Sequence, residues 1–323
     1  ITVHLKTEQG KEIIQRLIKQ SDVLIHNFRS DTIKKLGLDY DTVKAWNDKL
    51  IYCSITGFGN YGPYKELAGY DFVIQAMSGI TGTEQSGPVK VGVAISDVLT
   101  GMNAAISILA ALNERQQSGL GQNIDLSLFD SQVAALVNVA SNYLISGDVP
   151  GLLGNEHPNI VPYQTFATKD REIVIAVGND DQFRRLCTIL NEPSLAEDER
   201  YRTNEKRLQH RKQLTALLAD YFKQKTASEW QNLLNEAGIP CGPINDIESL
   251  FQEEQIKARN MLIEVEHPQA GKVPLVGSPL KFSRTPTTIR RHPPLPGEHN
   301  QEVLRELGYS DEEIDELNEA GII

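Results

Sequence analysis

The sequence predicts an α/β protein with a mostly parallel sheet in a large domain, joined to a smaller α+β domain. Short apolar runs typical of buried strands alternate with helical patterns through the first half of the chain, an order typical of parallel α/β sheets. The second half is more polar and opens with two strand patterns. A length of 323 residues also corresponds to about two domains of ~150 residues each.

The first elements alternate in type. Within residues 8–20, apolar side chains recur on one face, and this period predicts an amphipathic helix. Apolar runs at 23–25 and 50–58 predict buried strands. Residues 31–48 between them predict a helical stretch, and the opening segment ITVHLKT reads as a strand already under way.

Longer apolar segments follow. Residues 70–78 predict a short helix and 81–90 a loop. The segment 97–119 predicts a long helix whose apolar stripes indicate that it is buried nearly all round. Residues 122–129 then predict a strand, and 130–145 predict a second apolar helix.

The second half predicts a smaller domain between two connecting segments. Proline and glycine without apolar periodicity mark the first connection. Ser310 and Glu313 form a capping box that predicts the start of the last helix. The predicted division is large domain 1–150, linker 151–162, small domain 163–245, linker and return segment 246–298, and C-terminal helices of the large domain 299–323.

Composition excludes several classes of protein. The 43 acidic and 32 basic residues give a net charge of −11, which argues against nucleic acid or an anionic membrane as the main partner. The sequence shows no signal peptide and no apolar run near the ~18 residues of a membrane span, which predicts a cytoplasmic protein, or a mitochondrial matrix protein in a eukaryote.

Cysteine and histidine give no sign of a metal site. Cys53, Cys187 and Cys241 are far apart and odd in number, so we expect reduced apolar fillers and no disulfide framework. None of the seven histidines pairs with another ligand at helical spacing, and we expect no metal. The chain also lacks a Gly-x-Ser-x-Gly nucleophile elbow, which weakens a hydrolase interpretation.

A glycine-rich string follows the second predicted strand. GFGNYG (57–62) matches G-x-G-x-x-G, the dinucleotide-binding pattern. Pro63 follows at once, however, and the next residues lack the apolar period of the required crossover helix. We therefore favour a glycine-rich loop near the polar end of some ligand.

Asp97 stands where the apolar β-type run VGVAI (91–95) leads into the long helix. One interpretation is an N-cap or first-turn acid that complements the helix dipole. The other is a nucleophilic carboxylate held among backbone N–H donors at the end of a strand, where α/β sheets often bind ligands. The residue pattern alone leaves both open.

Taken together, many segments of the chain resemble the class III coenzyme A-transferase family, in the same order. They span nearly the whole chain, and the match of YCSITGFG, VPYQTF and EHP looks most like the dicarboxylate-using branch, the succinyl-CoA:glutarate type. The segments are LKTEQGKEI (5–13), DVLIHNF (22–28), LGLDY (36–40), SITGFGNYGP (54–63), AGYDFVIQAMSG (68–79), GPVKVGVAISDVLTG (87–101), ILAALNERQQSGLGQNIDLSLFDS (108–131) and AGIPCGPI (237–244).

The resemblance implies an acyl-CoA:carboxylate CoA-transferase with Asp97 as catalytic nucleophile. In the family mechanism the aspartate attacks the donor thioester and forms a mixed anhydride. The released CoA thiolate converts this to an aspartyl-CoA thioester, and the acceptor carboxylate reverses the sequence. Such acyl exchanges need oxyanion donors and exclusion of water, but no metal or nucleotide.

The resemblance also assigns binding residues, with CoA entering as a thioester substrate and no cofactor bound permanently. The basic cluster Arg29, Lys34 and Lys35 suits the phosphates of CoA, or is a solvated helix face. The positions that match the family's CoA site are Val3, His4, Leu5, Lys6, Asn27, Phe28, Arg29, Lys35, Thr56, Gly57, Phe58 and Gly59.

A second loop has an implied role at the substrate. GNDDQ (178–182) matches a loop that covers the active site, and some family members have a run of glycines there. Here Asp180 and Asp181 with the following Gln182 stand in that loop, which puts the same use of backbone donors in doubt.

Three further expectations come from the resemblance. The family forms interlocked homodimers around a Rossmann-like large domain. Full-length members begin with a strand–helix–strand unit that this chain lacks, so we expect a fragment. The segment AMSGITGTE (76–84) is also a few residues shorter than usual, and either departure could impair activity.

Two alternative functions remain open at this point. The family contains α-methylacyl-CoA racemases, which use a Gly-His-Asp motif. Here the tripeptide is Gly69-Tyr70-Asp71, and a tyrosine with an ordinary pKa of ~10 is a poor proton shuttle at neutral pH. The other alternative is an inactive fragment that binds CoA.

Overall fold

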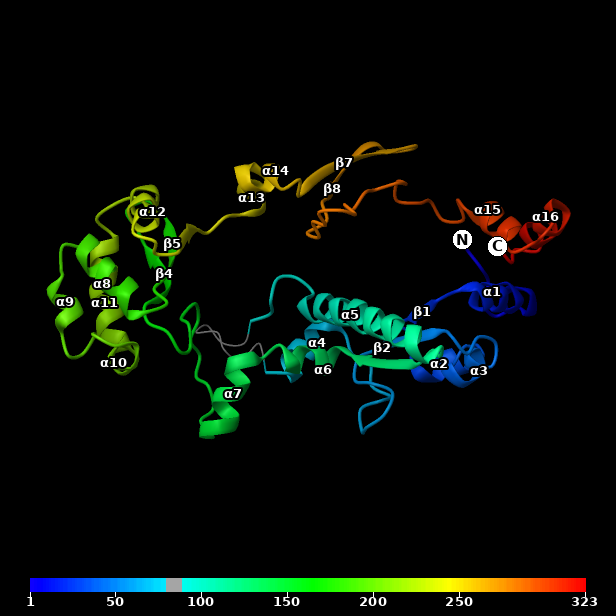
Figure 1. The fold of residues 1–323 in the computed structure, drawn as a ribbon, viewed down its shortest axis with the longest axis horizontal. Helices are drawn as coiled ribbons and strands as arrows, with labels where there is room; N and C mark the ends of the chain where they lie inside the picture. The colour runs from blue at the N-terminus through cyan, green and yellow to red at the C-terminus, as the bar shows by residue number, and fades with distance from the viewer. Residues whose placement is uncertain (80–88) are drawn as a thin grey trace. The chain divides into compact units, whose positions relative to one another are not determined.

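The computed structural model describes residues 1–79 and 89–323, and most of the loop predicted at 81–90 lies outside them. The described residues form two compact units, which we call unit 1 and unit 2 (Figure 1). Unit 1 contains the described residues up to Pro150 together with Arg291–Ile323. Unit 2 contains Gly151–Arg290.

Unit 1 is built on a parallel sheet of three strands in the order β1-β2-β3. Its elements are α1 (Glu8–Gln20), β1 (Val23–His26), α2 (Ser30–Lys35), α3 (Tyr40–Lys44), β2 (Ile51–Thr56), α4 (Asp71–Met77), α5 (Ile95–Ser118), β3 (Asn123–Ser127), α6 (Leu128–Ala134), α7 (Val137–Ser146), α15 (Asn300–Glu306) and α16 (Asp311–Glu319).

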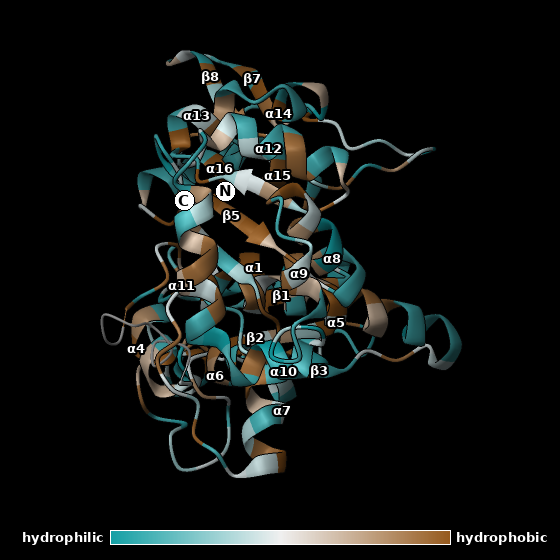
Figure 2. Ribbon diagram, turned by 90° about the vertical axis from the view of Figure 1, so that its left-hand side faces the viewer, coloured by the Kyte–Doolittle hydropathy of each residue, from teal (hydrophilic) through white to brown (hydrophobic). Residues whose placement is uncertain are grey.

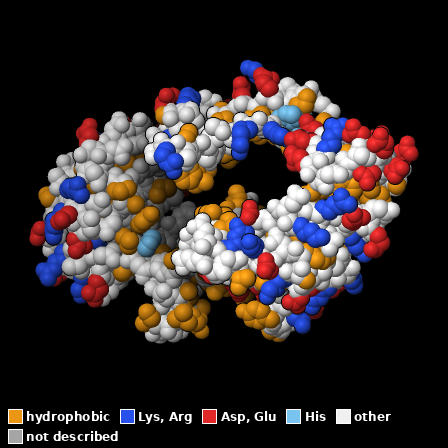
Figure 3. Space-filling view, turned by 45° about the vertical axis from the view of Figure 1, so that its right-hand side comes forward, with side chains coloured by type: hydrophobic (Ala, Val, Ile, Leu, Met, Phe, Trp, Pro, Cys, Tyr) orange, Lys and Arg blue, Asp and Glu red, His pale blue; other side chains and the backbone are white. Residues whose placement is uncertain are grey.

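The core of unit 1 joins the two ends of the chain. The apolar face of α1 packs on α15 and α16, and the His4 N–H donates to the Ile322 carbonyl over 2.7 Å. Acidic side chains gather over the outside of the C-terminal helices (Figure 3). The buried residues of this cluster are Ile13, Leu304, Leu307, Ile314 and Ile322.

Unit 2 has two antiparallel sheets, β4-β5-β6 and the hairpin β7-β8. After Glu172, strand β5 is hydrophobic (Figure 2) and lies within an apolar core that α8, α11 and α12 complete. Its elements are β4 (Tyr163–Ala167), β5 (Glu172–Ala176), α8 (Asp180–Ile189), α9 (Ser194–Glu197), α10 (Asn204–Gln209), α11 (Arg211–Phe222), α12 (Ala227–Glu236), β6 (Cys241–Pro243), α13 (Ile247–Gln252), α14 (Glu254–Ala258), β7 (Leu262–His267) and β8 (Gly271–Val276).

The architecture is mixed α/β, with one parallel sheet and two antiparallel ones among the described residues, as predicted in outline. The amphipathic helix at 8–20 and the capping box of Ser310 and Glu313 are confirmed. The strand predicted at 122–129 is present as β3.

Several local predictions are wrong. The segment 31–48 forms two short helices, and 130–145 breaks into α6 and α7, where Val137 adopts a positive φ of 37°. Residues 1–7 form no strand, because their backbone turns into α1 and bonds to the C-terminus. The run 91–95 is also not a strand: Gly92 and Val93 form a bend, and Ile95 begins α5.

The prediction that α5 is buried nearly all round is also wrong. Thr100 and Ala104 face the interior, but Met102 is 58% exposed and Leu109 67% exposed. By length and composition α5 is the one helix among the described residues that could cross a membrane, yet it packs on α4, α6, β2 and β3 as part of the α/β fold.

Candidate active site

Asp97 lies in the first turn of α5 with an exposed side chain. It is not the N-cap, which is Ala94 and offers no capping side chain. Within residues 1–79 and 89–323, no hydrogen bond or ion pair engages the Asp97 carboxylate. The first-turn position favours a negative charge through the helix dipole, and the carboxylate is free to meet a reagent.

The surroundings make Asp97 more basic than an ordinary aspartate. Partial burial raises the pKa of its carboxyl, and the charge of Asp71 raises that pKa further. A carboxylate with a raised pKa is a better nucleophile while it remains ionised at neutral pH.

The glycine-rich loop at the carboxyl end of β2 is held by side chains of the sheet. Thr56 Oγ1 accepts the Gly59 N–H over 2.8 Å, and the Asp125 carboxylate of β3 accepts the Asn60 N–H over 3.0 Å. The Asn60 side chain donates to Asp125 Oδ1 over 2.8 Å and to Ser54 Oγ over 2.7 Å. The loop is therefore held in place by hydrogen bonds to strands β2 and β3.

Two glycines bring this loop against the start of α4. A Cβ built on Gly57 would lie 2.6 Å from the Gly69 Cα, and one built on Gly69 would lie 2.6 Å from the Gly57 Cα. Real Cβ atoms do not approach so closely, so both positions require glycine in this arrangement. The contact places the Thr56–Gly59 loop beside the tripeptide Gly69-Tyr70-Asp71.

The turn after β1 is tied to the same loop. Ser30 Oγ donates to Asn60 Oδ1 over 2.5 Å, and Arg29 donates to the Glu66 carbonyl over 3.2 Å. The structure thus brings the predicted CoA residues Asn27, Phe28 and Arg29 close to the loop Thr56–Gly59.

The basic side chains of α2 are well exposed. Arg29 and Lys35 lie 3.7 Å and 3.8 Å from the carboxylate of Asp31, and their side chains are 59% and 80% exposed. Pairs this long and this exposed contribute little to stability. Both cations therefore remain available to an anionic ligand.

A hollow of about 260 Å³ lies between α2, α3 and the sheet, with Lys34 at its wall. Inside it His26 Nδ1 accepts the Phe28 N–H, so His26 Nε2 carries the proton that it shares with the Tyr52 hydroxyl over 2.8 Å. Burial lowers the pKa of His26, which keeps the ring neutral.

The predicted CoA residues Val3, His4, Leu5 and Lys6 lie in unit 1 as well. They precede α1 and are bonded to the C-terminal segment through the His4 N–H. Val3 packs into the core that α1 shares with α15 and α16. Among the described residues, no hydrogen bond or ion pair joins this segment to the turn at Asn27–Arg29.

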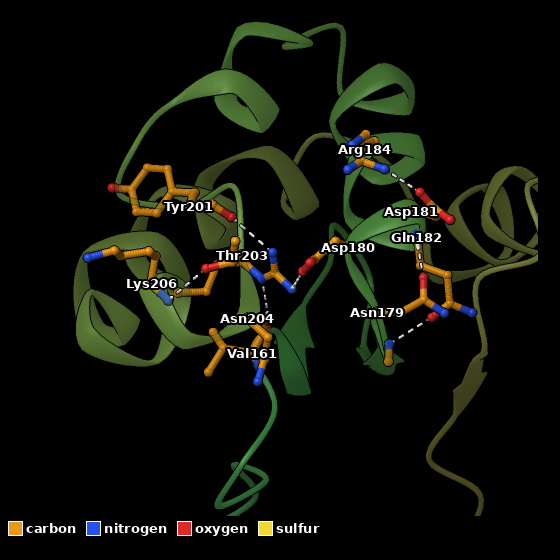
Figure 4. Close-up of polar contacts among 12 residues, drawn as sticks. Val161, Asn179, Asp180, Asp181, Gln182, Arg184, Tyr201, Thr203, Asn204 and Lys206 are labelled. Atoms are coloured by element: carbon orange, nitrogen blue, oxygen red, sulfur yellow. Dashed lines mark hydrogen bonds and ion pairs between the residues drawn. The ribbon is translucent and has the colours of Figure 1, made fainter.

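The side chains of the GNDDQ loop all form hydrogen bonds or ion pairs with other residues of unit 2. Asn179 caps α8, Asp181 and Arg184 point toward one another and are bonded, and Gln182 Oε1 accepts the Gly178 N–H over 2.7 Å (Figure 4). Asp180 Oδ1 accepts from Arg207 Nη2 over 2.8 Å.

Arg207 is a residue that sequence reasoning missed. It is fully buried and also donates to the carbonyls of Val161 and Tyr201, over 2.7 Å and 2.9 Å, while its guanidinium lies 4.5 Å from the centre of the Phe183 ring. Its sequence context, a charged helical segment, gives no sign that this cation is buried.

The remaining reactive groups give no competing site. Among the described residues no cluster of three or more His, Cys, Asp or Glu could hold a metal ion. All three cysteines are free, and burial raises the pKa of Cys187 to about 12, which leaves it as an unreactive thiol.

Comparisons with known proteins identify the family of this chain. The model of CoA-transferase family III matches residues 1–300. A succinate–glutarate CoA-transferase of Agrobacterium fabrum is 44% identical over 95% of this chain and 78% of its own length. The human succinyl-CoA:glutarate CoA-transferase is 39% identical over 100% of this chain and 75% of its own length.

A solved structure matches as well. The crystal structure of a CAIB/BAIF family protein from Brucella suis superimposes with a TM-score of 0.80, at 44% identity, covering 95% of this chain and 81% of that one. Fold and relatives together define an α/β enzyme that transfers CoA. The chain belongs to CoA-transferase family III, whose substrates are CoA thioesters, and the predicted resemblance is confirmed.

Proposed function

We propose that this enzyme moves CoA from succinyl-CoA to a short dicarboxylate through an aspartyl-CoA thioester on Asp97. The observation that carries the proposal is the carboxylate of Asp97 at the start of α5, which is exposed and has no partner within residues 1–79 and 89–323. Its raised pKa suits a nucleophile. The names of the relatives from Agrobacterium and human support glutarate as an acceptor.

Each step of the proposed reaction exchanges one acyl bond. An Asp97 oxygen attacks the thioester carbonyl, the C–S bond breaks, and CoA leaves as a thiolate. The thiolate then attacks the Asp97 carbonyl, forms the aspartyl-CoA thioester and releases the first acid as a carboxylate. The acceptor carboxylate repeats these steps in reverse, which regenerates Asp97 and yields the new acyl-CoA.

We also propose the CoA site predicted from the family, Val3–Lys6, Asn27–Arg29, Lys35 and Thr56–Gly59. The exposed guanidinium of Arg29 and ammonium of Lys35 support the assignment, because both can form charge-assisted hydrogen bonds to phosphates.

The role of Asp180, Asp181 and Gln182 as a substrate loop rests on the family resemblance alone. Their side-chain contacts, all within unit 2, give the loop its shape. We expect any contact of this loop with substrate to involve its backbone.

The oligomeric state and the finer fold are further parts of the proposal. We propose an interlocked homodimer with a Rossmann-like large domain formed from both ends of the chain. The inclusion of Arg291–Ile323 in unit 1 and the exposed apolar side chains of α5 support it. A monomer mass by light scattering would count against the dimer.

The proposed function is tested by mixing succinyl-CoA and a panel of carboxylates with the enzyme and identifying new acyl-CoA by mass spectrometry. Glutaryl-CoA is the expected main product. The same trace from Asp97→Ala as from the wild type would overturn the nucleophile assignment. Deuterium uptake at the α-carbon of a 2-methylacyl-CoA would instead favour racemase chemistry, for which Tyr70 is a poor proton carrier.

A further inference from the structure

A buried layer of polar side chains occupies the start of α5, directly before Asp97. Ser96 donates its backbone N–H to Asp71 Oδ1 over 2.8 Å and its hydroxyl to Gln132 Oε1 over 2.8 Å. Thr100 donates its hydroxyl to the Ser96 carbonyl over 2.7 Å. The N–H, carbonyl and hydroxyl of Ser96 therefore all have partners.

Asp71 is itself fixed from a second side. Gln75 Nε2 donates to Asp71 Oδ2 over 2.7 Å, and Gln75 Oε1 accepts the Val91 N–H over 2.9 Å. Asp71 is 9% exposed and Gln75 is fully buried. One carboxylate oxygen thus bonds within α4 and the other bonds to α5.

This carboxylate supplies the cap that α5 lacks at its own N-terminus. The first N–H groups of a helix have no acceptor within the helix, and the N-cap residue usually supplies one. Ala94 cannot do so because its side chain is a methyl group. Asp71, at the start of another helix, accepts the Ser96 N–H instead.

We propose that Asp71 is a positioning residue that fixes the direction of the Asp97 carboxylate by holding the Ser96 N–H at the start of α5. The inference rests on the proposed role of Asp97 as nucleophile. Ser96 and Asp97 are consecutive, so a displacement of the Ser96 backbone moves Asp97 with it. A misplacement of about 1 Å in an active site can lower the rate about a hundred-fold.

The charge of Asp71 has a second effect in the same direction. It opposes the ionised form of Asp97 and contributes to the raised pKa of that carboxyl. Attack on a thioester turns Asp97 into an uncharged anhydride, so the repulsion present before attack is relieved after it. Geometry and charge are separable, because the hydrogen bonds can be kept while the charge is moved.

Asp71→Asn removes the charge and places an NH₂ group where Asp71 Oδ2 accepts from the Gln75 amide. Two donors then face each other, and the layer must rearrange. Adding Gln75→Glu transposes amide and carboxylate. The new amide at position 71 accepts the Ser96 N–H and donates to the new carboxylate at position 75, which still accepts the Val91 N–H. Every hydrogen bond and the net charge are preserved.

The experiment measures kcat and KM with succinyl-CoA and glutarate, per folded molecule, for wild type, Asp71→Asn and the double variant Asp71→Asn/Gln75→Glu. We expect Asp71→Asn to lower kcat about 10- to 100-fold with KM for succinyl-CoA within about two-fold. The double variant is expected to recover most of that kcat. Asp246→Asn, which alters the capping carboxylate of α13, is the matched control and leaves kcat unchanged.

An unchanged kcat per folded molecule in Asp71→Asn would overturn the inference and leave Asp71 a purely structural residue. If Asp71→Asn does not fold, the kcat of the double variant decides whether Asp71 has a positioning role. Wild-type kcat in a folded double variant supports positioning by hydrogen bonds. A double variant that is folded but slow, or that does not fold, overturns it.

Failure of the proposed function gives a different result. The mass of the intact protein after mixing with succinyl-CoA reports covalent adducts. If Asp97→Ala keeps the adduct, Asp97 is not the nucleophile, whatever the variants at position 71 show. If Asp97→Ala loses the adduct and Asp71→Asn keeps full kcat, only the positioning role fails.

Discussion

Two polar networks, one in each unit, hold an acidic segment at the start of a helix, and they differ in the part of the chain that they bind. In unit 1, Asp71 and Gln75 hold the backbone of Ser96, and the carboxylate of the next residue, Asp97, has no partner among the described residues. In unit 2, Arg207 and Arg184 bind the side chains of Asp180 and Asp181 themselves.

The difference separates an acid that is left available for the proposed chemistry from acids that hold structure. Hydrogen bonds to the backbone orient a side chain and leave its carboxylate oxygens without a partner. Ion pairs to the carboxylates themselves neutralise their charge and lower their reactivity. Substitutions that break one network or the other test this distinction.

The largest effect is expected for Asp97→Asn, which keeps the size of the side chain and removes the nucleophile. CoA transfer should fall about a thousand-fold or more, as for loss of a nucleophile in other enzymes. The free energy of unfolding should change by no more than about 0.5 kcal/mol, because the carboxylate is exposed and unpartnered. Steady-state kinetics and urea unfolding measure the two quantities. A large loss of stability would contradict the conclusion that the Asp97 carboxylate makes no stabilising contact.

The next effect is structural and concerns Arg207→Met. The substitution leaves Asp180 and two buried carbonyls without their donor, so we expect a loss of about 3–5 kcal/mol in the free energy of unfolding. Urea unfolding measures it. Arg184→Met is the matched control, since Arg184 is 57% exposed and pairs with the neighbouring acid of the same loop. Equal losses in both variants would refute the structural distinction between these arginines.

A smaller effect is expected in the pH dependence of the reaction. Because Asp97 must be ionised and its pKa is raised, kcat/KM should fall on acidification at a pH above the ordinary aspartate value of ~3.9. Removing the charge in Asp71→Asn should move this acid limb to lower pH. The raised pKa in the folded state also means that this group's contribution to stability decreases as pH rises through it. An acid limb that moves to higher pH in the variant would contradict the repulsion between the two carboxylates.

The smallest effect is expected for Asp181→Ala. Its pair with Arg184 is exposed, so the free energy of unfolding should change by about 0.5 kcal/mol or less. Thermal unfolding of Asp181→Ala and of Asp180→Ala compares the loss of stability in the two variants. The Asp180 variant should be clearly less stable, because it leaves the buried Arg207 without its anion. A smaller loss in the Asp180 variant than in the Asp181 variant would reverse the order derived from burial.

Local sequence signals predicted the parts of the fold that depend on neighbours in the chain. The apolar period of 8–20 and the Ser310 capping box each lie within one helix, and both are confirmed. The break between α6 and α7 was missed because 130–145 contains no glycine or proline, and nothing in its composition marks Val137, whose φ is positive.

Contacts between distant residues were beyond such signals. The bond from Ser96 to Asp71 spans 25 positions, and that from Arg207 to Val161 spans 46. The apolar pattern of 97–119 predicted a buried helix. Such a pattern does not show which of the apolar side chains the rest of unit 1 covers, and Leu109 is exposed. Asp97 itself was singled out from its place before a helix, and the family resemblance then favoured the chemical interpretation over the capping one.

The core shared by α1, α15 and α16 also sets an order of events during synthesis. The apolar face around Ile13 leaves the ribosome roughly 290 residues before its partners Leu304 and Ile314. At ~5–20 residues per second, that face waits roughly 15–60 s for them. The core of unit 2, in contrast, is contiguous in sequence and can form while the ribosome is still working. The apolar face of α1 therefore stays uncovered by these partners until α15 and α16 have been translated.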